Sequence, residues 1–485
     1  MNLISAILNH ARTSPRTPAL AEIGGEIDYR SLALAVARTA GHLASIGITA
    51  GDRVGLCLKN TADHVIIFLA VGYIGAVAVS LDWRARPEEI ERIARALGLK
   101  QMIAEPDVRM PTGSPVVMQD ATWDRDVTQA KPLPQAAATW ENVLAISVTS
   151  GSSGTPKFVA VTHLQFFFRA CGFLELLGLS GRHRLLCTLP LGFGAWPRCL
   201  AHLLRGDCII VYPSLFSAAE YVDVARRMRA TIGGVVPTTI RQLLSIAAGP
   251  PLLPEMMLLT GGAPLSADEK GQACQLLTPN FYEQLGTTEF GTLTVLRPAD
   301  IGERARSVGR PHSLVKIEIV DADDRPLPRG ATGRLRYRGA ALGSPLALLD
   351  QSIAPHGFHD GWHYPDEIAH LDDQWFLFLH GRISDIINRG GAKFYPVEIE
   401  NVLRTHENVA EVAVLNRRQE GSDDDVIAFV VLRGDGQVSD LIAHSRAHLS
   451  AYKVPRRFHL VVQLPRTASG KIDKAALAKA IEGDT

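Results

Sequence analysis

Short runs of β-branched and apolar residues alternate with longer stretches of helical periodicity through most of the chain. Runs of this kind at residues 143–148, 208–212 and 231–236 are typical of buried strands. Such regular alternation predicts parallel α/β layers. The apolar segment 65–81 is slightly short for a membrane span and contains Gly72 and Gly75, so we expect a buried helix followed by a buried strand.

The pattern changes in the last third of the chain. From Val315, short strands separated by turns predict a β meander. Beyond residue 381, a helix expected at 397–406 and strands expected at 411–416 and 426–432 indicate a small, separate α+β unit. The predicted fold class is therefore α/β, with a large N-terminal domain of layered α/β subdomains plus a meander, and a small C-terminal α+β domain.

The length of the chain bears on the number of domains, and its net charge bears on the kinds of partner it can bind. With 485 residues the chain is too long for one compact domain. The 50 basic and 50 acidic residues cancel, which argues against a nucleic acid or an anionic membrane as partner. The N-terminus lacks the long apolar run of a secretory signal, and the six cysteines are scattered, so we expect a cytoplasmic protein with free thiols. The proline-rich stretch 108–135 is expected to be irregular surface structure.

The segment TSGSSGTPK, residues 149–157, follows the predicted strand 143–148. Its glycines let successive backbone N–H groups point at one anion, while its hydroxyl groups and one lysine add further donors. A polyphosphate is the expected guest. The spacing differs from that of a Walker P-loop, and a polar surface turn is the alternative interpretation.

Two further segments are weaker signals when taken alone. YEQLGTTEFG, residues 282–291, places a tight turn before Glu289, and one carboxylate beside a phosphate site suits Mg²⁺. PRTASGKIDK, residues 465–474, places Lys471 in a polar loop near the C-terminus, where a solvated basic tail is the ordinary interpretation.

Together and in this order, the three segments resemble the adenylate-forming superfamily of acyl-CoA synthetases, peptide-synthetase adenylation domains and firefly luciferase. The resemblance extends over nearly the whole chain and includes IDYRSL (27–32), GAVAVSLDWRARPEEI (75–90) and TGGAPLS (260–266). It implies ATP-dependent activation of a carboxylic acid to an acyl-adenylate, release of pyrophosphate, and transfer to a thiol. The implied cofactors are ATP, Mg²⁺ and CoA, or phosphopantetheine on an acyl or peptidyl carrier protein.

The resemblance also implies roles for individual residues. Phosphate contacts are expected from Thr149, Ser150, Gly151, Ser152, Ser153, Gly154, Thr155 and Lys157. Other nucleotide contacts are expected from Gly262, Ala263, Pro264, Leu285, Gly286, Thr287, Glu367 and Arg382, of which Glu367 and Arg382 reach the ribose. Thr288 would contact the α-phosphate, Glu289 would hold Mg²⁺, and Lys471 would bridge the carboxylate and the α-phosphate, where negative charge accumulates.

Four positions depart from the family pattern. Phe158 follows Lys157 where a glycine is common, and Leu285 replaces an aromatic ring against adenine. In DGWHYPDE, residues 360–367, the ribose-binding carboxylate is expected at Glu367, with Asp366 at the glycine position. Ser384 occupies the hinge position. A nucleotide-binding homologue that has lost catalysis is therefore the rival interpretation, although the residues expected to carry catalysis are present.

The acid pocket is expected around Phe193, Gly194, Trp196, Val236, Pro237 and Gly261. Gly194 lies where amino-acid-activating relatives carry an aspartate, so an α-ammonium would be buried unpaired. A neutral-tailed aryl or short-to-medium aliphatic acid is the expected substrate. The thiol is expected to pass Gly390, Gly391 and Lys393. This stretch is compatible with CoA and with a carrier protein as the thiol acceptor. The expected domains are 1–381 and 386–485, joined by a hinge at 382–385.

Overall fold

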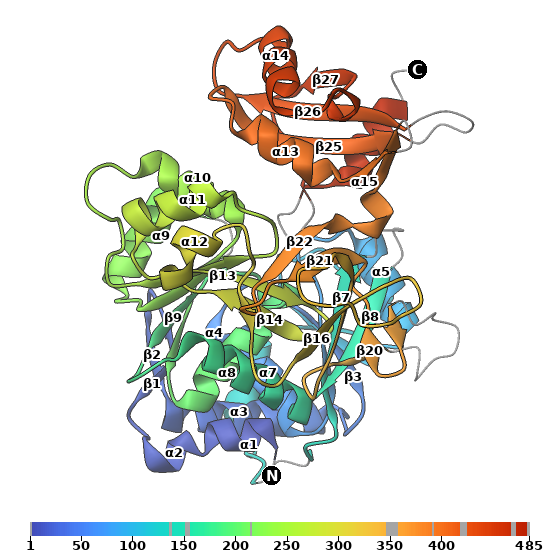
Figure 1. Ribbon diagram of the computed structural model, residues 1–485. Coiled ribbons are helices and arrows are strands. Elements are labelled where there is room, and N and C mark those ends of the chain that lie inside the picture. The colour runs from blue at the N-terminus through green and yellow to red at the C-terminus, as the bar shows by residue number, and fades with distance from the viewer. Residues whose placement is uncertain are drawn as a thin grey trace. The chain divides into compact units, whose positions relative to one another are not determined.

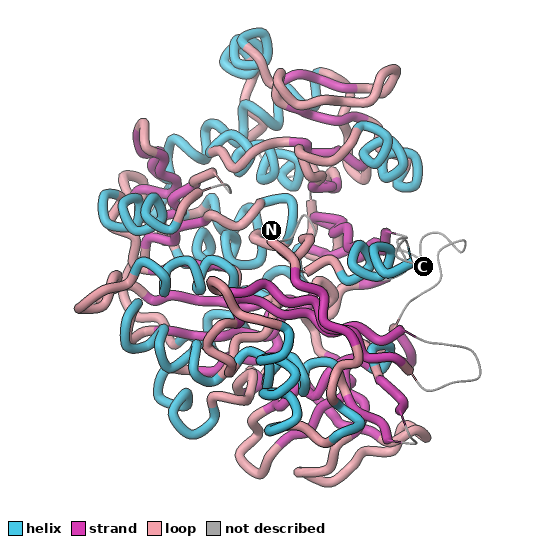
Figure 2. Tube along the Cα trace, turned by 90° about the horizontal axis from the view of Figure 1, so that it is seen from above, coloured by secondary structure: helices cyan, strands magenta, loops and turns pink. Residues whose placement is uncertain are grey.

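The computed structural model describes residues 2–134, 138–150, 156–213, 216–345, 357–389, 392–417, 424–466 and 472–482. It forms two compact units, and Figure 1 labels many of their elements. The first comprises Met1–Ala305, Gly309–Lys316 and Arg338–Phe358, and the second comprises Arg306–Val308, Ile317–Tyr337 and His359–Thr485. Helices and strands alternate along the chain (Figure 2), which confirms the predicted α/β class.

A nine-stranded sheet carries most of the candidate site in the first unit. Its order is β15 (Arg310–Pro311), β14 (Gly291–Leu296), β13 (Phe281–Thr287), β12 (Met257–Gly261), β11 (Ile232–Val235), β9 (Arg184–Cys187), β10 (Cys208–Val211), β1 (Pro18–Glu22) and β2 (Gly25–Asp28). The strands from β13 to β1 are parallel, and antiparallel pairs close both edges. The strands predicted near 208–212 and 231–236 are confirmed as β10 and β11.

A seven-stranded sheet forms the second layer of this unit. Its order is β18 (Ser344–Pro345), β8 (Pro156–Thr162), β7 (Val143–Ser150), β4 (Val77–Ser80), β3 (Arg53–Cys57), β5 (Gln101–Ala104) and β6 (Val116–Met118). The apolar segment 65–81 is confirmed as a buried helix, α4 (Ala62–Tyr73), followed by the buried strand β4. Thr61 caps α4, and Gly75, with φ +80°, makes the turn into β4.

Helices pack on both sheets of the first unit. They are α1 (Leu3–Leu8), α2 (His10–Thr13), α3 (Tyr29–Ser45), α5 (Pro87–Leu97), α6 (Ala121–Gln129), α7 (His163–Leu177), α8 (Trp196–Arg205), α9 (Ala218–Arg227), α10 (Pro237–Ile246), α11 (Ala267–Gln272) and α12 (Ile301–Arg304), besides α4. One hydrophobic cluster joins α1, α3, α4, α6, α7 and α8 to both sheets, with Leu185 from one sheet and Leu144 from the other. Phe68 of α4 stacks on Trp196 of α8 with ring centroids 3.6 Å apart.

The expectation of irregular structure over 108–135 is wrong in part. This stretch contains the strand β6 and the helix α6, which begins where the Asp120 carboxylate accepts hydrogen bonds from the N–H groups of Thr122 and Trp123. The Trp123 ring is buried and packs edge-on against His42. A cap and a single buried aromatic ring therefore fix a helix that the surrounding prolines hide in the sequence pattern.

The second unit contains the predicted meander and the small α+β part. One sheet has the order β19 (Phe358–His359), β20 (Trp362–His363), β17 (Gly333–Arg338), β21 (Glu367–Leu371) and β22 (Leu377–Arg382), with β16 (Lys316–Val320) paired to β17. The remaining elements are β23 (Ile387–Arg389), β24 (Ala392–Phe394), α13 (Pro396–Arg404), β25 (Val409–Arg417), β26 (Asp425–Leu432), α14 (Val438–His448), β27 (Arg457–Leu460) and α15 (Lys474–Glu482). The helix and two strands predicted between 397 and 432 are confirmed as α13, β25 and β26.

The sequence predicts a buried helix in place of a membrane span, and free cysteine thiols. Among the helices that the structure describes, none combines the length and the apolar character needed to cross a membrane. All six cysteines are free, and Cys57, Cys187, Cys199 and Cys208 are buried.

Candidate active site

The candidate site in the first unit lies at one edge of the nine-stranded sheet. Parallel strands end at the same edge, so the segments that follow β9, β11, β12 and β13 open there together. Val236 and Pro237 follow β11, while Thr288 and Glu289 follow β13. The structure thus gathers residues that the sequence assigned to the acid pocket and to the nucleotide.

The predicted adenine-lining segment begins directly after β12. Gly261 pairs with Gln284 of β13, and a Cβ atom at position 261 would lie 2.5 Å from the Gln284 carbonyl oxygen. Only glycine therefore fits there. Gly262 has φ +91° and is exposed, and Ala263 and Pro264 continue the same open turn. The turn leaves backbone groups accessible at the sheet edge.

The turn after β13 is held by its backbone. A register shift between Leu285 and Gly286 bends the strand, and a Cβ atom at position 286 would lie 2.9 Å from the Gly291 carbonyl oxygen. The Thr287 hydroxyl oxygen accepts a hydrogen bond from the Phe290 N–H at 3.2 Å. Leu285 is partly exposed on β13, as a residue that contacts a ligand must be.

Arg169 of α7 fixes the Thr288–Glu289 segment and was not predicted. This buried guanidinium donates to the carbonyl oxygens of Thr288, at 3.2 Å, and Glu289, at 2.6 Å. It also donates to Ala341 at 3.0 Å, and the Gly343 N–H donates to Glu289 at 2.7 Å. The only sequence signal was a single arginine inside the apolar run FFFRACGF. Arg169 is a positioning residue, because it orients the backbone that carries the two candidate side chains.

Glu289 is the candidate Mg²⁺ ligand. Among the described residues, no group of three His, Cys, Asp or Glu side chains is arranged to hold a metal ion. Mg²⁺ prefers one or two carboxylates together with phosphate oxygens and water. The half-buried Glu289 at the sheet edge fits that donor set, with the nucleotide supplying the other oxygens.

The predicted phosphate loop connects two antiparallel strands. Thr149 pairs with Lys157 and Ser150 with Pro156 across β7 and β8, so the two ends of the loop are paired with each other. Gly151, Ser152, Ser153, Gly154 and Thr155 lie outside the described residues. Phe158, which departs from the family pattern, is buried against β4 and α5 residues, so the core accommodates it.

Two of the predicted acid-pocket residues, next to the start of α8, differ in burial. Gly194 is exposed with φ +98°. Trp196 is buried, stacks on Phe68, and donates its indole N–H to the Ser80 hydroxyl at 3.1 Å. Its ring is therefore anchored in the core.

The second unit holds the predicted ribose ligands side by side. Glu367 and Arg382 pair directly across β21 and β22, and Arg382 Nε donates to Glu367 Oε1 at 3.3 Å. Burial raises the pKa of Glu367, and the nearby Arg382 opposes that shift. Asp366 has φ +62° and is exposed, and its carboxylate accepts from the Ser384 N–H at 3.4 Å.

The remaining predicted residues of the second unit belong to the thiol channel and the catalytic lysine loop. Gly390, Gly391 and Lys471 lie outside the described residues. The Lys393 backbone pairs with Asn388 in the short hairpin of β23 and β24.

Two family models match this chain. The family model described as AMP-binding enzyme matches residues 7–344, and the model of the AMP-binding enzyme C-terminal domain matches residues 398–471. The chain belongs to the AMP-binding enzyme family. The predicted membership of the adenylate-forming superfamily, and with it the prediction that the chain is an enzyme, is confirmed at the level of the family.

Relatives of this AMP-binding enzyme match along its full length. A fatty acid–[acyl-carrier-protein] ligase, ScoC, from Streptomyces coeruleorubidus is 27% identical and covers 100% of this chain and 97% of its own length. A 2-succinylbenzoate–CoA ligase from Listeria monocytogenes is also 27% identical, covering 96% and 97%. The fold resembles that of o-succinylbenzoate CoA synthetase (MenE) from Bacillus subtilis, solved with its acyl-adenylate intermediate, with a TM-score of 0.87, 23% identity and 97% of each chain covered. The same synthetase was also solved with ATP and magnesium ion.

Proposed function

We propose that this AMP-binding enzyme joins a small carboxylic acid to the thiol of CoA through an acyl-adenylate. A carboxylate oxygen attacks the α-phosphorus of ATP, and the bond to the pyrophosphate oxygen breaks. The thiol sulfur then attacks the acyl carbon and loses its proton, and AMP leaves. The observation that carries the proposal is the meeting of the segments after β9, β11, β12 and β13 at one sheet edge.

The proposed residue roles are those that the family resemblance implies. The turn at Gly262 and the segment Leu285–Thr287 receive the adenine, and Glu367 with Arg382 binds the ribose. Thr288 contacts the α-phosphate, and Glu289 holds Mg²⁺, which neutralises phosphate charge when bound. Their positions are supported by the paired strands β12 and β13 and by the Glu367–Arg382 pair. Lys471 bridges the reacting carboxylate and α-phosphate.

The proposed domains remain 1–381 and 386–485, with Ser384 in the hinge and the thiol passing Gly391. The matches to family models at 7–344 and 398–471 fall on either side of this hinge. The proposed location is the cytoplasm. An acyl carrier protein is the alternative acceptor, since one relative is a ligase of that kind.

ATP–pyrophosphate exchange tests the proposal directly. A panel of ferulate, medium-chain fatty acids and 2-succinylbenzoate represents the acids named for the relatives, and standard amino acids serve as controls. We expect exchange with at least one non-amino acid and none with α-amino acids, since Gly194 offers no counter-ion for an ammonium group. AMP release is then scored with CoA and with a phosphopantetheinylated carrier protein. Failure of every acid to support exchange would favour the inactive nucleotide-binding homologue.

A further inference from the structure

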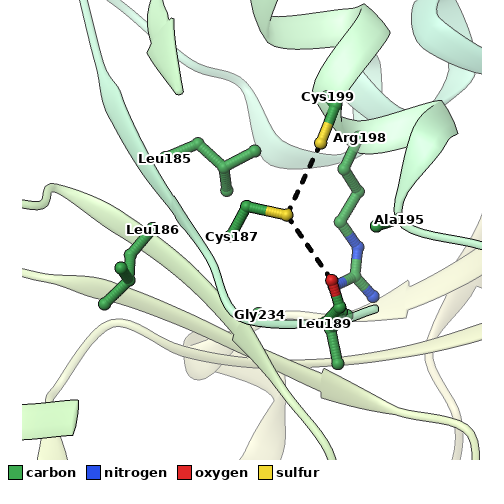
Figure 3. A pocket seen from close by; sticks show the side chains of 8 residues that line it. All are labelled: Leu185, Leu186, Cys187, Leu189, Ala195, Arg198, Cys199 and Gly234. Atoms are coloured by element: carbon green, nitrogen blue, oxygen red, sulfur yellow. Dashed lines mark hydrogen bonds between the residues drawn. The ribbon is translucent and has the colours of Figure 1, made fainter. Parts of the chain in front are cut away.

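Arg198 points its guanidinium group into a small hollow beside the candidate acid pocket (Figure 3). The side chain comes from α8 and reaches Gly234 of β11. The hollow has a volume of about 10 Å³, enough for one water-sized group. It is lined by Leu185, Leu186, Cys187, Leu189, Ala195, Arg198, Cys199 and Gly234.

The strand β11 makes room for this guanidinium. A Cβ atom at Gly234 would lie 2.1 Å from Arg198 Nη1, so any other residue would displace the side chain. The neighbouring Gly233 leaves similar room for the Tyr221 hydroxyl. Two adjacent glycines in a buried strand weaken it, and here each admits a large side chain with a polar end.

No protein counter-charge accompanies Arg198 in the part of the chain that the structure describes. Nη1 is buried and has no hydrogen-bond partner among those residues. The nearby Cys187 and Cys199 thiols interact with each other at 3.6 Å. The hydrogen bond that the Cys199 thiol donates to Cys187, together with burial, raises the pKa of Cys199, so that thiol stays neutral. Arginine stays protonated in proteins, and a buried, unpaired cation is costly.

The hollow belongs to the region that receives the acid. Ala195 lies between the predicted pocket residues Gly194 and Trp196, and Gly234 precedes the pocket residue Val236 by two positions. The segment that follows β9 leads into α8, and Val236 follows the end of the parallel strand β11. An acid bound between these segments would have the Arg198 guanidinium within its pocket, next to Gly234.

We propose that the acid carries a second anionic group, a carboxylate in the simplest case, which pairs with Arg198. This inference rests on the proposed function and keeps the aryl or aliphatic skeleton. A second anionic group takes the place of the neutral tail that the sequence alone predicts. The guanidinium supplies the charge-assisted hydrogen bonds that a planar carboxylate accepts.

The experiment compares matched acids in ATP–pyrophosphate exchange. Terephthalate and a series of aliphatic diacids are each paired with their monomethyl esters, which differ only in the charge at the far end. For the wild type we expect a preference of about 10- to 100-fold in kcat/KM for the diacid. Arg198→Met should abolish or reverse that preference while leaving the KM for ATP unchanged. Arg205→Met, on the same helix but paired with Asp207 at 3.1 Å, serves as the matched control and should keep the preference.

A second measurement is independent of activity. Because Arg198 lacks a protein counter-charge, Arg198→Met should keep or raise the thermal midpoint of the free enzyme, whereas Arg205→Met should lower it. Equal exchange with diacids and esters, or an unchanged ratio in Arg198→Met, would overturn the inference and leave the proposed function standing. Exchange with none of these acids, nor with the ferulate, fatty-acid and 2-succinylbenzoate panel, would overturn the proposed function and this inference with it.

Discussion

At the scale of single residues, the turn at Asp366 distinguishes two neighbouring carboxylates. Asp366 has φ +62°, a conformation that favours glycine, and its carboxylate accepts a hydrogen bond from the Ser384 N–H. Glu367 is the first residue of β21, and its carboxylate lies beside Arg382. The two neighbouring acids are therefore expected to have different tasks: Asp366 holds the turn, and Glu367 is the proposed ribose ligand.

Substitution separates these tasks. Glu367→Ala should raise the KM for ATP by about tenfold or more, because it removes charge-assisted acceptors from the ribose hydroxyls. Asp366→Asn keeps the turn and should leave the KM for ATP close to that of the wild type. Steady-state kinetics at saturating acid checks both variants. A larger effect in Asp366→Asn would show that the alignment through Trp362 and Arg382 is wrong.

The counting argument that selected Glu367 succeeded in placing it beside Arg382 because it used only local spacing. Glu367 and Arg382 are fifteen residues apart on the two strands of one β-hairpin, so their pairing depends on that hairpin alone. Arg169 and Arg198 could not be found in this way. Their partners at 288–289 and 234 lie far away in sequence, and only tertiary packing brings them together.

At the scale of elements, the apolar strands were predictable because their runs of apolar residues end at turns. The strands at 143–148, 208–212 and 231–236 are buried, and burial leaves a continuous apolar run that is visible in a single sequence. Helix α6 depends on one cap and one buried ring, and prolines flank it, so its pattern was hidden. The loop Gly151–Thr155 was assigned from its composition, and its geometry stays a prediction.

Helices α4 and α7 each bury a histidine, and this makes the first unit sensitive to acid. His64 and His163 are fully buried, and burial lowers the pKa of each to about 4. An unfolded chain protonates histidine near pH 6.5, so between about pH 6.5 and 4 the unfolded state binds more protons. Stability contributed by the neutral rings is present above this window and is lost as the pH falls through it. For each ring the difference corresponds to roughly 3 kcal/mol.

His163→Leu should therefore flatten the decline in the urea-unfolding midpoint between pH 6.5 and 4. Neither ring nitrogen of His163 has a hydrogen-bond partner among the described residues, so an apolar replacement costs little at neutral pH. His359→Gln, a change at an exposed histidine in the second unit, is the control and should keep the wild-type slope. Equal slopes in all three proteins would contradict the assignment of acid sensitivity to His163.

At the scale of the whole molecule, the two half-reactions place opposite demands on the C-terminal part. Adenylation needs a cation where carboxylate and α-phosphate join, and thiol transfer needs room for a phosphopantetheine arm. In the proposed function, Lys471 and the Gly390–Gly391 pair supply these features, and all three residues follow the proposed hinge at Ser384 in the sequence. One rotation of this part between half-reactions would satisfy both demands in turn.

The two half-reactions, measured separately, test this division of labour. Lys471→Ala should slow adenylation by about 10²- to 10³-fold, the usual effect of losing one transition-state contact, yet convert preformed acyl-adenylate to thioester at nearly the wild-type rate. Gly391→Trp should show the opposite pattern, because its ring obstructs the thiol. Lys474→Ala removes a nearby lysine that is paired with Asp385 at 3.4 Å and should leave both rates close to wild type. If Lys471→Ala impaired both half-reactions equally, the lysine would have to stay in the site throughout, and a rotation that withdraws it before thiol attack would be ruled out.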